Sequence, residues 1–392
     1  MRVSVGIDIA KEVHWVTAID DYGEIRLDHR LDNTPAAIEA LIGELRALEG
    51  EVVIGLDMVG GIAGLAAAML AAAGFRLVHV PGLAVNRARQ GTTGGESKSD
   101  PRDARVIADQ TRIRRDLRPI EAGTELDLEI RLLAKRRRDL VDDQTRRLNR
   151  LRDLLVSIFP GLERALDFTT KGALWLVSKY VTPAELREAS RRKVVRHLPR
   201  AGGLPNVKTL ADTALAAAEA QRIAISGERM SAVLIRELAV EALTTRERIA
   251  TLDRELETLL QHCPNAVLIR SLPGMGVVLT AEFIAEVGSV HRFSSADALA
   301  AAAGLAPVLR QSGKVRFLKR PTGGNKALKR VFYQSAFCSL QAADSRAFYD
   351  RKRKEGKRHH QALLALARRR INVLWAMLKD RQPFQAGFKN AA

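Results

Sequence analysis

Four aspartates in the first part of the chain have the types and spacing to carry out chemistry. Asp8 lies in VGIDIAK and Asp57 in VVIGLDMVGG, while Asp100 and Asp103 lie close together in ESKSDPRDARVIA. Two of them stand in apolar, strand-like runs, where an unpaired carboxylate is costly to bury. Converging carboxylates are hard oxygen ligands for Mg²⁺, and paired ions can activate a nucleophile and stabilise a leaving oxygen at phosphorus. The four acids therefore predict a magnesium site for phosphodiester chemistry.

Each acid also has a purely structural interpretation. Asp100 precedes Pro101, and an aspartate followed by proline is a common beginning of a helix, with the aspartate as its N-cap. Asp8 and Asp57 could be acids that simply stand at the edge or end of a strand. Against this, a spacing of three residues places Asp100 and Asp103 on one face of a helical turn. The catalytic interpretation depends on all four acids together.

The charge balance of the chain favours a polyanionic partner. The 392 residues hold 63 Lys and Arg against 45 Asp and Glu, a net charge of +18, and such an excess is typical of proteins that bind nucleic acid. A basic surface without a partner is the alternative. Cys263 and Cys338 are the only cysteines, so neither a disulfide framework nor a thiolate zinc site is predicted. Without a signal segment or a long apolar span, we expect a soluble protein of the reducing cytoplasm, with no membrane partner.

The elements around the acids follow the order of an RNase H-like domain. Residues 3–9 alternate apolar and small or polar side chains, which is the period of a strand. Further strands are expected near 15–19, 24–31, 52–57 and 76–80, with helices near 35–48, 62–73 and 100–115. In an RNase H-like fold the first strand, the fourth strand and a late helix meet at one end. Residues 1–120 are therefore predicted to form an α/β domain that gathers the acids.

Residues 121–265 are predicted to be a helical coiled-coil region. A long helix is expected over 121–159 and a second over 215–260, with an irregular, arginine-rich insert at 162–205 between them. Basic clusters lie along the outer faces of both helices. These clusters fit a solvated hairpin that serves dimerisation or a surface that contacts nucleic acid, and both can hold together.

Residues 266–392 form the third predicted domain, which is mainly helical. It begins with SLPGMGVVLTAEFIAEVG, where a glycine-rich turn between helices either presents N–H groups to a phosphate or only joins the helices. A run without acids follows from Arg310 to Arg330, and it is suited to tracking a nucleic-acid backbone. Its predicted nucleic-acid-binding residues are Arg310, Lys314, Arg316, Lys319, Arg320, Asn325, Lys326, Lys329 and Arg330.

Ser312 lies within this basic run, in RQSGKVR. A serine in a basic loop is usually a loop residue, and no neighbouring histidine is available as its base. From chemistry alone, a nucleophilic Ser312 would need activation by metal or by the surrounding cations.

Several of these segments resemble the bacterial insertion-sequence transposases of the IS-one-ten group, also called DEDD transposases or bridge-RNA-guided recombinases. The matching residues are GIDIAK, the stretch from Lys98 to Ala108, LPGMGVVLTAEFIAEVG, and AGLAP followed by QSG and GGNKALKR, in family order and over nearly the whole chain. The resemblance implies a RuvC-like domain whose Asp8, Asp57, Asp100 and Asp103 bind Mg²⁺, a coiled-coil middle, and a C-terminal domain with Ser312 as the nucleophile.

The same resemblance implies a mechanism and its partners. The serine would form a covalent link to DNA, at a site built from domains of different subunits of a homodimer or homotetramer, and a structured RNA would pair with target and donor DNA. One departure is visible, because the family's second acid is usually Glu and here it is Asp57. Two alternatives stay open: a hydrolytic RuvC-like nuclease in which Ser312 is not the nucleophile, and a decayed protein that only binds nucleic acid.

Overall fold

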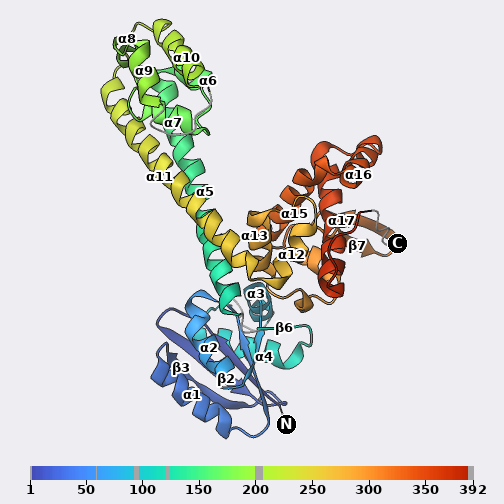
Figure 1. Cartoon of the computed structure of the whole chain (residues 1–392). Coiled ribbons are helices and arrows are strands. Elements are labelled where there is room, and N and C mark those ends of the chain that lie inside the picture. Colours follow the sequence, from blue (N-terminus) through green and yellow to red (C-terminus); the bar gives the residue numbers. More distant parts are fainter. Residues whose placement is uncertain (1, 59, 92–96, 121–123, 199–205, 387–392) are drawn as a thin grey trace. The chain divides into compact units, whose positions relative to one another are not determined.

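The computed structural model describes residues 2–58, 60–91, 97–120, 124–198 and 206–386. The chain forms two compact units, Met1–Thr124 and Glu125–Ala392, which are described separately below (Figure 1). Within the described ranges, no helix is both long enough and apolar enough to cross a membrane.

The N-terminal unit is built on one mixed sheet. Its strands are β1 (Arg2–Asp8), β2 (Val13–Ile19), β3 (Ile25–Asp32), β4 (Glu51–Leu56), β5 (Arg76–His79) and β6 (Arg118–Pro119). Their order is β3-β2-β1-β4-β5-β6, with β1 antiparallel to β2 and parallel to β4. A three-stranded meander followed by alternating helices and strands is the order expected of an RNase H-like domain. The sheet places the ends of β1 and β4 side by side.

Helices cover both faces of this sheet. On one face, α1 (Pro35–Ala47) and α2 (Gly64–Ala72) bury Ile38, Leu41 and Leu70 against the odd-numbered valines and isoleucine of β1. On the other face lies α4 (Asp100–Ile113), and α3 (Gly82–Gln90) precedes it. Helix α3 was not predicted from the sequence. Successive side chains of a strand point to opposite faces, so α4 meets the even-numbered residues of β1. This is the face toward which Asp8 projects.

Two glycines allow α4 to lie directly on the sheet. A Cβ atom at Gly6 of β1 would stand 2.1 Å from the Ala104 carbonyl oxygen, and one at Gly55 of β4 would stand 2.1 Å from Thr111 Oγ1. Both positions therefore require a residue without a side chain. The result is that the beginning of α4 lies against the ends of β1 and β4.

Two helices of 34 residues, α5 (Glu125–Ile158) and α11 (Glu228–Gln261), pack against each other in the C-terminal unit (Figure 1). The helices α6 (Pro160–Ala165), α7 (Lys171–Val177), α8 (Pro183–Glu188), α9 (Arg191–His197) and α10 (Val207–Glu219) share a separate apolar core with one end of the pair. The segment expected to be irregular is thus largely helical where it is described. The second long helix was predicted to begin near 215, but α10 ends at Glu219 and Gly227, with φ of 84°, precedes α11.

The remaining elements form a second core in this unit. They are α12 (Pro264–Ser271), α13 (Val277–Val287), α14 (Ala296–Ala302), β7 (Val308–Ser312), β8 (Val315–Lys319), α15 (Lys326–Cys338), α16 (Ala343–Lys354) and α17 (His359–Asp380), with single turns at Val290–Arg292 and Ser339–Gln341. Phe283, Phe332 and Leu374 are fully or almost fully buried in this core. Gly274, in the turn between α12 and α13, would carry a Cβ 2.6 Å from the Ser335 carbonyl oxygen. Tight packing thus explains why position 274 is a glycine, and no contact with a phosphate is needed to explain it.

Candidate active site

Asp8 and Asp57 stand at adjacent positions where two neighbouring parallel strands end. The register pairs Ile7 with Leu56, so the next residue along each strand is one of the acids. The Ile9 N–H donates a hydrogen bond of 3.3 Å to Asp57 Oδ1, which ties the end of β1 to the second acid. Both carboxylates lie on the same face of the sheet as Gly6 and Gly55, which is the face that α4 covers.

Asp100 and Asp103 occupy the first turn of α4. The N-cap of this helix is Ser99 and Asp100 is its first residue, so the alternative that Asp100 caps the helix is wrong. Asp100 is exposed, whereas Asp103 is buried. An acid in the first turn of a helix interacts favourably with the helix dipole. The contact of α4 with Gly6 and Gly55 brings this turn beside the strand ends.

The electrostatics of Asp8 and Asp57 reflect the nearby acids. Burial raises the pKa of Asp8 to about 7, and the charges of Asp57, Asp103 and Asp100 add to the rise. Burial also raises the pKa of Asp57, and Asp103 contributes in the same direction. Like charges disfavour each other's ionised forms only when they are near. The structure therefore brings Asp8, Asp57, Asp100 and Asp103 into one cluster.

Two cations that the sequence analysis missed belong to this cluster. Arg89 of α3 donates from Nη1 to both carboxylate oxygens of Asp103, at 2.8 and 2.9 Å. Lys98 lies close enough to lower the pKa values of Asp8 and Asp57, although burial and the neighbouring acids outweigh it. No sequence motif pointed to Arg89, because it enters the cluster only through the fold of α3 against α4.

The cluster has the ligand chemistry of a divalent-cation site. Within the described ranges, no three carboxylate, imidazole or thiolate groups lie close enough together to hold a metal ion as they stand. Asp103 is instead engaged by Arg89. The ligand types nevertheless suit a hard cation, because the neighbouring acids raise the pKa values of Asp8 and Asp57 and added positive charge would relieve that repulsion.

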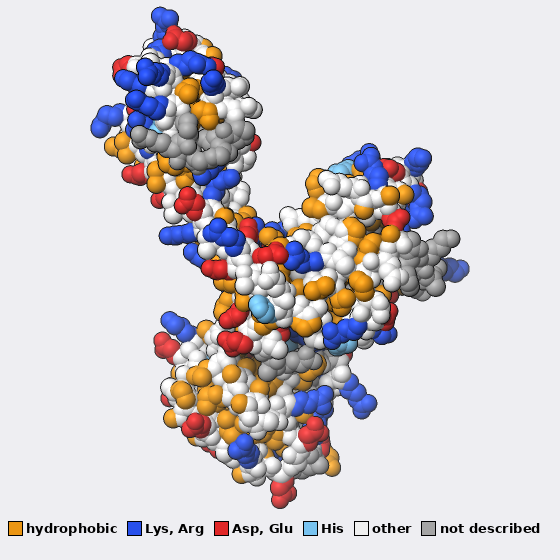
Figure 2. Space-filling model, viewed as in Figure 1, with side chains coloured by type: hydrophobic (Ala, Val, Ile, Leu, Met, Phe, Trp, Pro, Cys, Tyr) orange, Lys and Arg blue, Asp and Glu red, His pale blue; other side chains and the backbone are white. Residues whose placement is uncertain are grey.

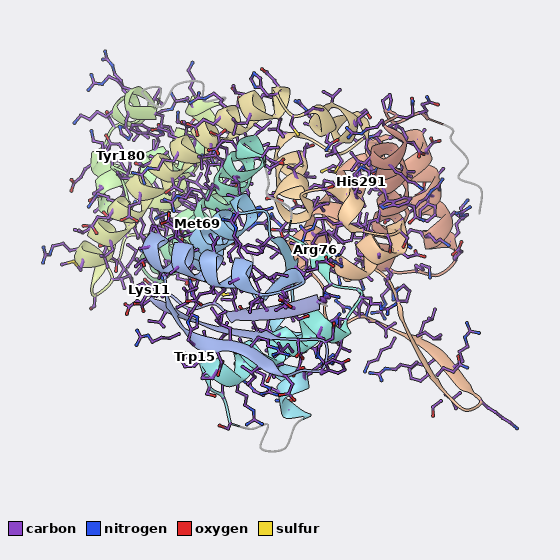
Figure 3. All side chains as sticks on the ribbon, turned by 90° about the horizontal axis from the view of Figure 1, so that it is seen from below. Lys11, Trp15, Met69, Arg76, Tyr180 and His291 are labelled. Carbon is purple, nitrogen blue, oxygen red and sulfur yellow. The ribbon has the colours of Figure 1, made fainter. Side chains whose placement is uncertain are left out.

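Ser312 lies at the end of β7, beside the turn of a two-stranded hairpin. It pairs with Val315 of β8, and Gly313 in the turn has φ of 54°. Every residue of β7 and β8 is exposed, and Figure 3 shows the hairpin extending away from the helices of its own unit. The serine hydroxyl is therefore accessible, but it belongs to the unit that does not contain the four acids.

Most of the predicted nucleic-acid-binding cations surround this hairpin. Lys319, Arg320, Lys326 and Lys329 line a hollow of about 550 Å³ together with the loop 321–324. Arg310, Lys314 and Arg316 are exposed on the hairpin itself. These side chains lie where a phosphate backbone could reach them.

Two of the predicted residues have protein partners. Asn325 caps α15 through a bond from Leu328 N–H and donates to Glu286 Oε2 at 2.6 Å. Arg330 and Arg138 of α5 both pair with Glu282, which is 3% exposed. Their nucleic-acid contacts stay a prediction, and the structure gives both residues a role in joining α15 to α13.

Known proteins similar to this one match it over the whole chain. A DEDD-type transposase family model matches residues 5–160, and a model described as transposase IS116/IS110/IS902 family matches residues 266–368. A 42 kDa protein of insertion element IS900 from Mycobacterium paratuberculosis is 42% identical and covers 100% of this chain and 99% of its own. The chain belongs to the IS116/IS110/IS902 family of transposases. This transposase is accordingly an enzyme that acts on DNA.

Two further insertion-element proteins agree with this placement. A 44.8 kDa protein of insertion element IS116 from Streptomyces clavuligerus is 42% identical to this transposase, over 98% of this chain and 96% of its own. A 43.6 kDa protein of insertion element IS110 from Streptomyces coelicolor is 35% identical, over 96% of this chain and 94% of its own. Among solved structures, T. thermophilus RuvC in complex with a Holliday junction substrate matches with 14% identity and a TM-score of 0.24, over 31% of this chain and 100% of that chain.

Proposed function

We propose that this transposase cleaves and rejoins DNA strands with the Ser312 hydroxyl as nucleophile and with Mg²⁺ held by Asp8, Asp57, Asp100 and Asp103. The observation that carries the proposal is the convergence of Asp57, Asp100 and Asp103 on Asp8, whose pKa their charges help to raise, in an enzyme of a transposase family. When bound, the cation would neutralise charge that develops on the transferring phosphate. The exposed hairpin lets the serine reach such a phosphate.

The residues divide the chemistry between them. Ser312 Oγ attacks phosphorus and loses its proton, a phosphoserine ester forms, and the bond from phosphorus to the departing strand oxygen breaks, with that oxygen taking up a proton. Attack by a hydroxyl of another strand end reverses these steps and restores the serine. Arg310, Lys314 and Arg316 would hold the strand backbone beside the hairpin, because guanidinium and ammonium groups bind phosphates without reading bases.

A covalent-adduct assay on cognate DNA tests the serine. With DNA and RNA from the element's flanks and Mg²⁺, the wild type is expected to give a protein–DNA adduct resistant to denaturation, and Ser312→Ala to give none. Ser294→Ala, which removes an exposed hydroxyl of the same unit outside the hairpin and the basic hollow, is the matched control and keeps the adduct. Cleavage by the wild type without any adduct would favour the hydrolytic nuclease. The absence of Mg²⁺-dependent cleavage with every substrate would favour a decayed, binding-only protein.

We further propose that the acids and the serine that act together come from different copies of the chain, in a homodimer or homotetramer. The two functional groups lie in separate compact units, which supports an exchange between copies. Mixing the Asp8→Asn and Ser312→Ala proteins tests this directly. If the site is shared between copies, a mixed oligomer combines the intact acids of one variant with the intact serine of the other and regains activity. If the mixture stays as inactive as its components, the serine and acids act within one chain.

A structured guide RNA is the remaining proposed partner. Lys and Arg side chains gather over the end of the C-terminal unit formed by α6 to α10 and over α16 (Figure 2), and exposed Arg192 and Lys193 belong to the first of these surfaces. Such surfaces suit any polyanion. Omitting the flanking RNA from the joining reaction is expected to abolish strand exchange, and exchange with DNA alone would contradict the RNA requirement. In the cell, the complex would act at the bacterial nucleoid in the cytoplasm.

A further inference from the structure

The C-terminal unit contains a cavity remote in sequence from Ser312 and from the acids. It has a volume of about 410 Å³ and lies between α17, the beginning of α16, the turn after α12 and the segment 382–386. The Phe384 N–H donates to Ser271 Oγ at 2.8 Å, which ties that last segment to α12. Apolar side chains make up most of the wall, among them Leu272, Pro273, Leu366, Val373, Met377 and Phe384.

The wall also includes one deeply buried cation, Arg370 of α17. The residue is 4% exposed. Its Nε donates to Ser335 Oγ at 3.0 Å and its Nη2 donates to the Pro273 carbonyl oxygen. No carboxylate among the described residues pairs with it, and burial lowers the pKa of its guanidinium to about 10. A buried charge is costly when it lacks an opposite charge, so Arg370 retains an unmet preference for an anion.

The other charges of the wall restrict what that anion can be. Arg369 stacks its guanidinium over the Phe348 ring at 5.0 Å, so its position has a structural cause. Asp344 and Asp380 are exposed at the same wall. A nucleic-acid strand would bring several phosphates past these two carboxylates, whereas a small ligand with a single charge can place that charge at Arg370 alone.

We propose that this cavity binds a small molecule with an apolar body and one anionic group, which forms charge-assisted hydrogen bonds with the Arg370 guanidinium. The volume falls in the range of small-molecule sites, which are lined mainly by apolar side chains with a few polar groups that fix orientation. Bonds from arginine to an ionised acceptor are shorter and stronger than neutral ones. The site is independent of the strand-transfer chemistry proposed above.

Calorimetric titration of the full-length protein tests this site with defined probes. 2-Naphthoate, benzoate and decanoate supply an apolar body with one carboxylate, and 2-naphthamide is the neutral counterpart of the first. At about 0.15 M salt, where exposed charges are largely screened, at least one carboxylate is expected to bind at a single site. Where 2-naphthoate is a carboxylate that binds, we expect it to bind at least about tenfold more tightly than 2-naphthamide. Binding by none of the three carboxylates at millimolar concentration would overturn the proposal, as would equal affinity for naphthoate and naphthamide.

Variants locate the binding. Ala376→Trp fills the cavity from α17 without changing Arg370 and is expected to weaken binding at least about tenfold. Asn372→Trp, on an exposed position of the same helix outside the cavity, is the matched control and leaves the affinity unchanged. Arg370→Gln is expected to reduce the affinity for the carboxylate to that of the neutral probe. Wild-type affinity in folded Ala376→Trp would show that the probes bind elsewhere and would refute the assignment.

Discussion

Arg89 holds Asp103 with a single guanidinium nitrogen, Nη1, which lies 2.8 Å from one carboxylate oxygen and 2.9 Å from the other. Both side chains are largely removed from solvent, at 12% and 8% exposure. The pair joins α3 to the first turn of α4 and places one positive charge against the acid cluster. In the absence of a metal ion, this guanidinium therefore supplies a counter-charge to Asp103 beside its acidic neighbours.

Arg89→Gln is expected to destabilise the metal-free protein and to increase its response to Mg²⁺. Removing one partner of a nearly buried pair leaves the other charge uncompensated, at a cost of about 3 kcal/mol. A cation at the cluster would recover part of that loss. Thermal melts with and without Mg²⁺ measure both effects, and Arg87→Gln, an exposed cation on the same helix, is the control. A smaller Mg²⁺-induced rise in Tm for Arg89→Gln than for wild type would contradict this role.

Asp8→Asn is expected to stabilise the protein above pH 7 and to have little effect near pH 4. The pKa of Asp8 is raised from 3.8 to about 7 on folding. Between these values the folded state holds a proton that the unfolded state has released, so wild-type stability falls as pH rises through the window. Asparagine carries no charge at any pH. Allowing for solvent screening, the gain at pH 8 is about 1–2 kcal/mol.

Denaturant unfolding of wild type and Asp8→Asn at pH 4 and pH 8, without metal, measures this difference. A difference that is equal at both pH values would show that Asp8 titrates normally. A destabilised variant at pH 8 would show that the ionised carboxylate makes a favourable contact that the structure does not contain.

Gly6→Ala is expected to disrupt the N-terminal unit, because its new Cβ would stand 2.1 Å from the Ala104 carbonyl oxygen and 2.3 Å from the Ala108 nitrogen. Both atoms are backbone, so α4 itself would have to move, at a cost of about 3 kcal/mol or more. Gly43→Ala is the control: this glycine lies in α1 with nothing within 4 Å of its added Cβ. Alanine there should stabilise the helix by about 0.5–1 kcal/mol. Equal melting temperatures for the two variants would contradict the close contact of α4 with β1.

Lys319→Ala and Lys326→Ala are each expected to weaken nucleic-acid binding and to reduce the salt dependence. Each lysine lines the hollow before α15, and a lost phosphate contact lowers the slope of log K against log salt by about 1. Arg30→Ala removes the same charge from a surface cation already paired with Asp32 and should leave the slope unchanged. Titrations of labelled DNA at several salt concentrations measure the slopes, and unchanged slopes for both lysine variants would remove this hollow from the interface.

Local sequence patterns predicted the first unit well because each element carries its own signal. The alternation along β1 placed Asp8 on the face away from the apolar core, and the spacing of Asp100 and Asp103 placed both on one turn. The approach of α4 to the sheet was less visible, since it depends on Gly6 and Gly55 meeting residues about 100 and 56 positions away. Arg89 was missed because its partner, Asp103, lies 14 positions away on another helix and no motif links the two residues.

The helices after α5 show the limit of periodicity. Short helices of six or seven residues, such as α6 to α9, give too few turns for an apolar stripe, so their segment was predicted to be irregular. Helix α11 begins after Gly227, which has a left-handed conformation. Apolar residues before and after this glycine continue the helical pattern, so the sequence did not predict a break there. The exposed hairpin that carries Ser312 was read as a loop, because its strands bury no face.

The most direct test of the account is the binding of Mg²⁺ to the purified protein, measured by calorimetry for wild type, Asp8→Asn and Asp109→Asn. Asp109 lies on the same helix as Asp103 but pairs with Arg112, so its variant controls for the loss of one acid. We expect wild type and Asp109→Asn to bind Mg²⁺ with equal affinity and Asp8→Asn to bind it at least about tenfold more weakly. No detectable Mg²⁺ binding by wild type, or wild-type affinity in Asp8→Asn, would contradict the claim that the four aspartates form a cation site.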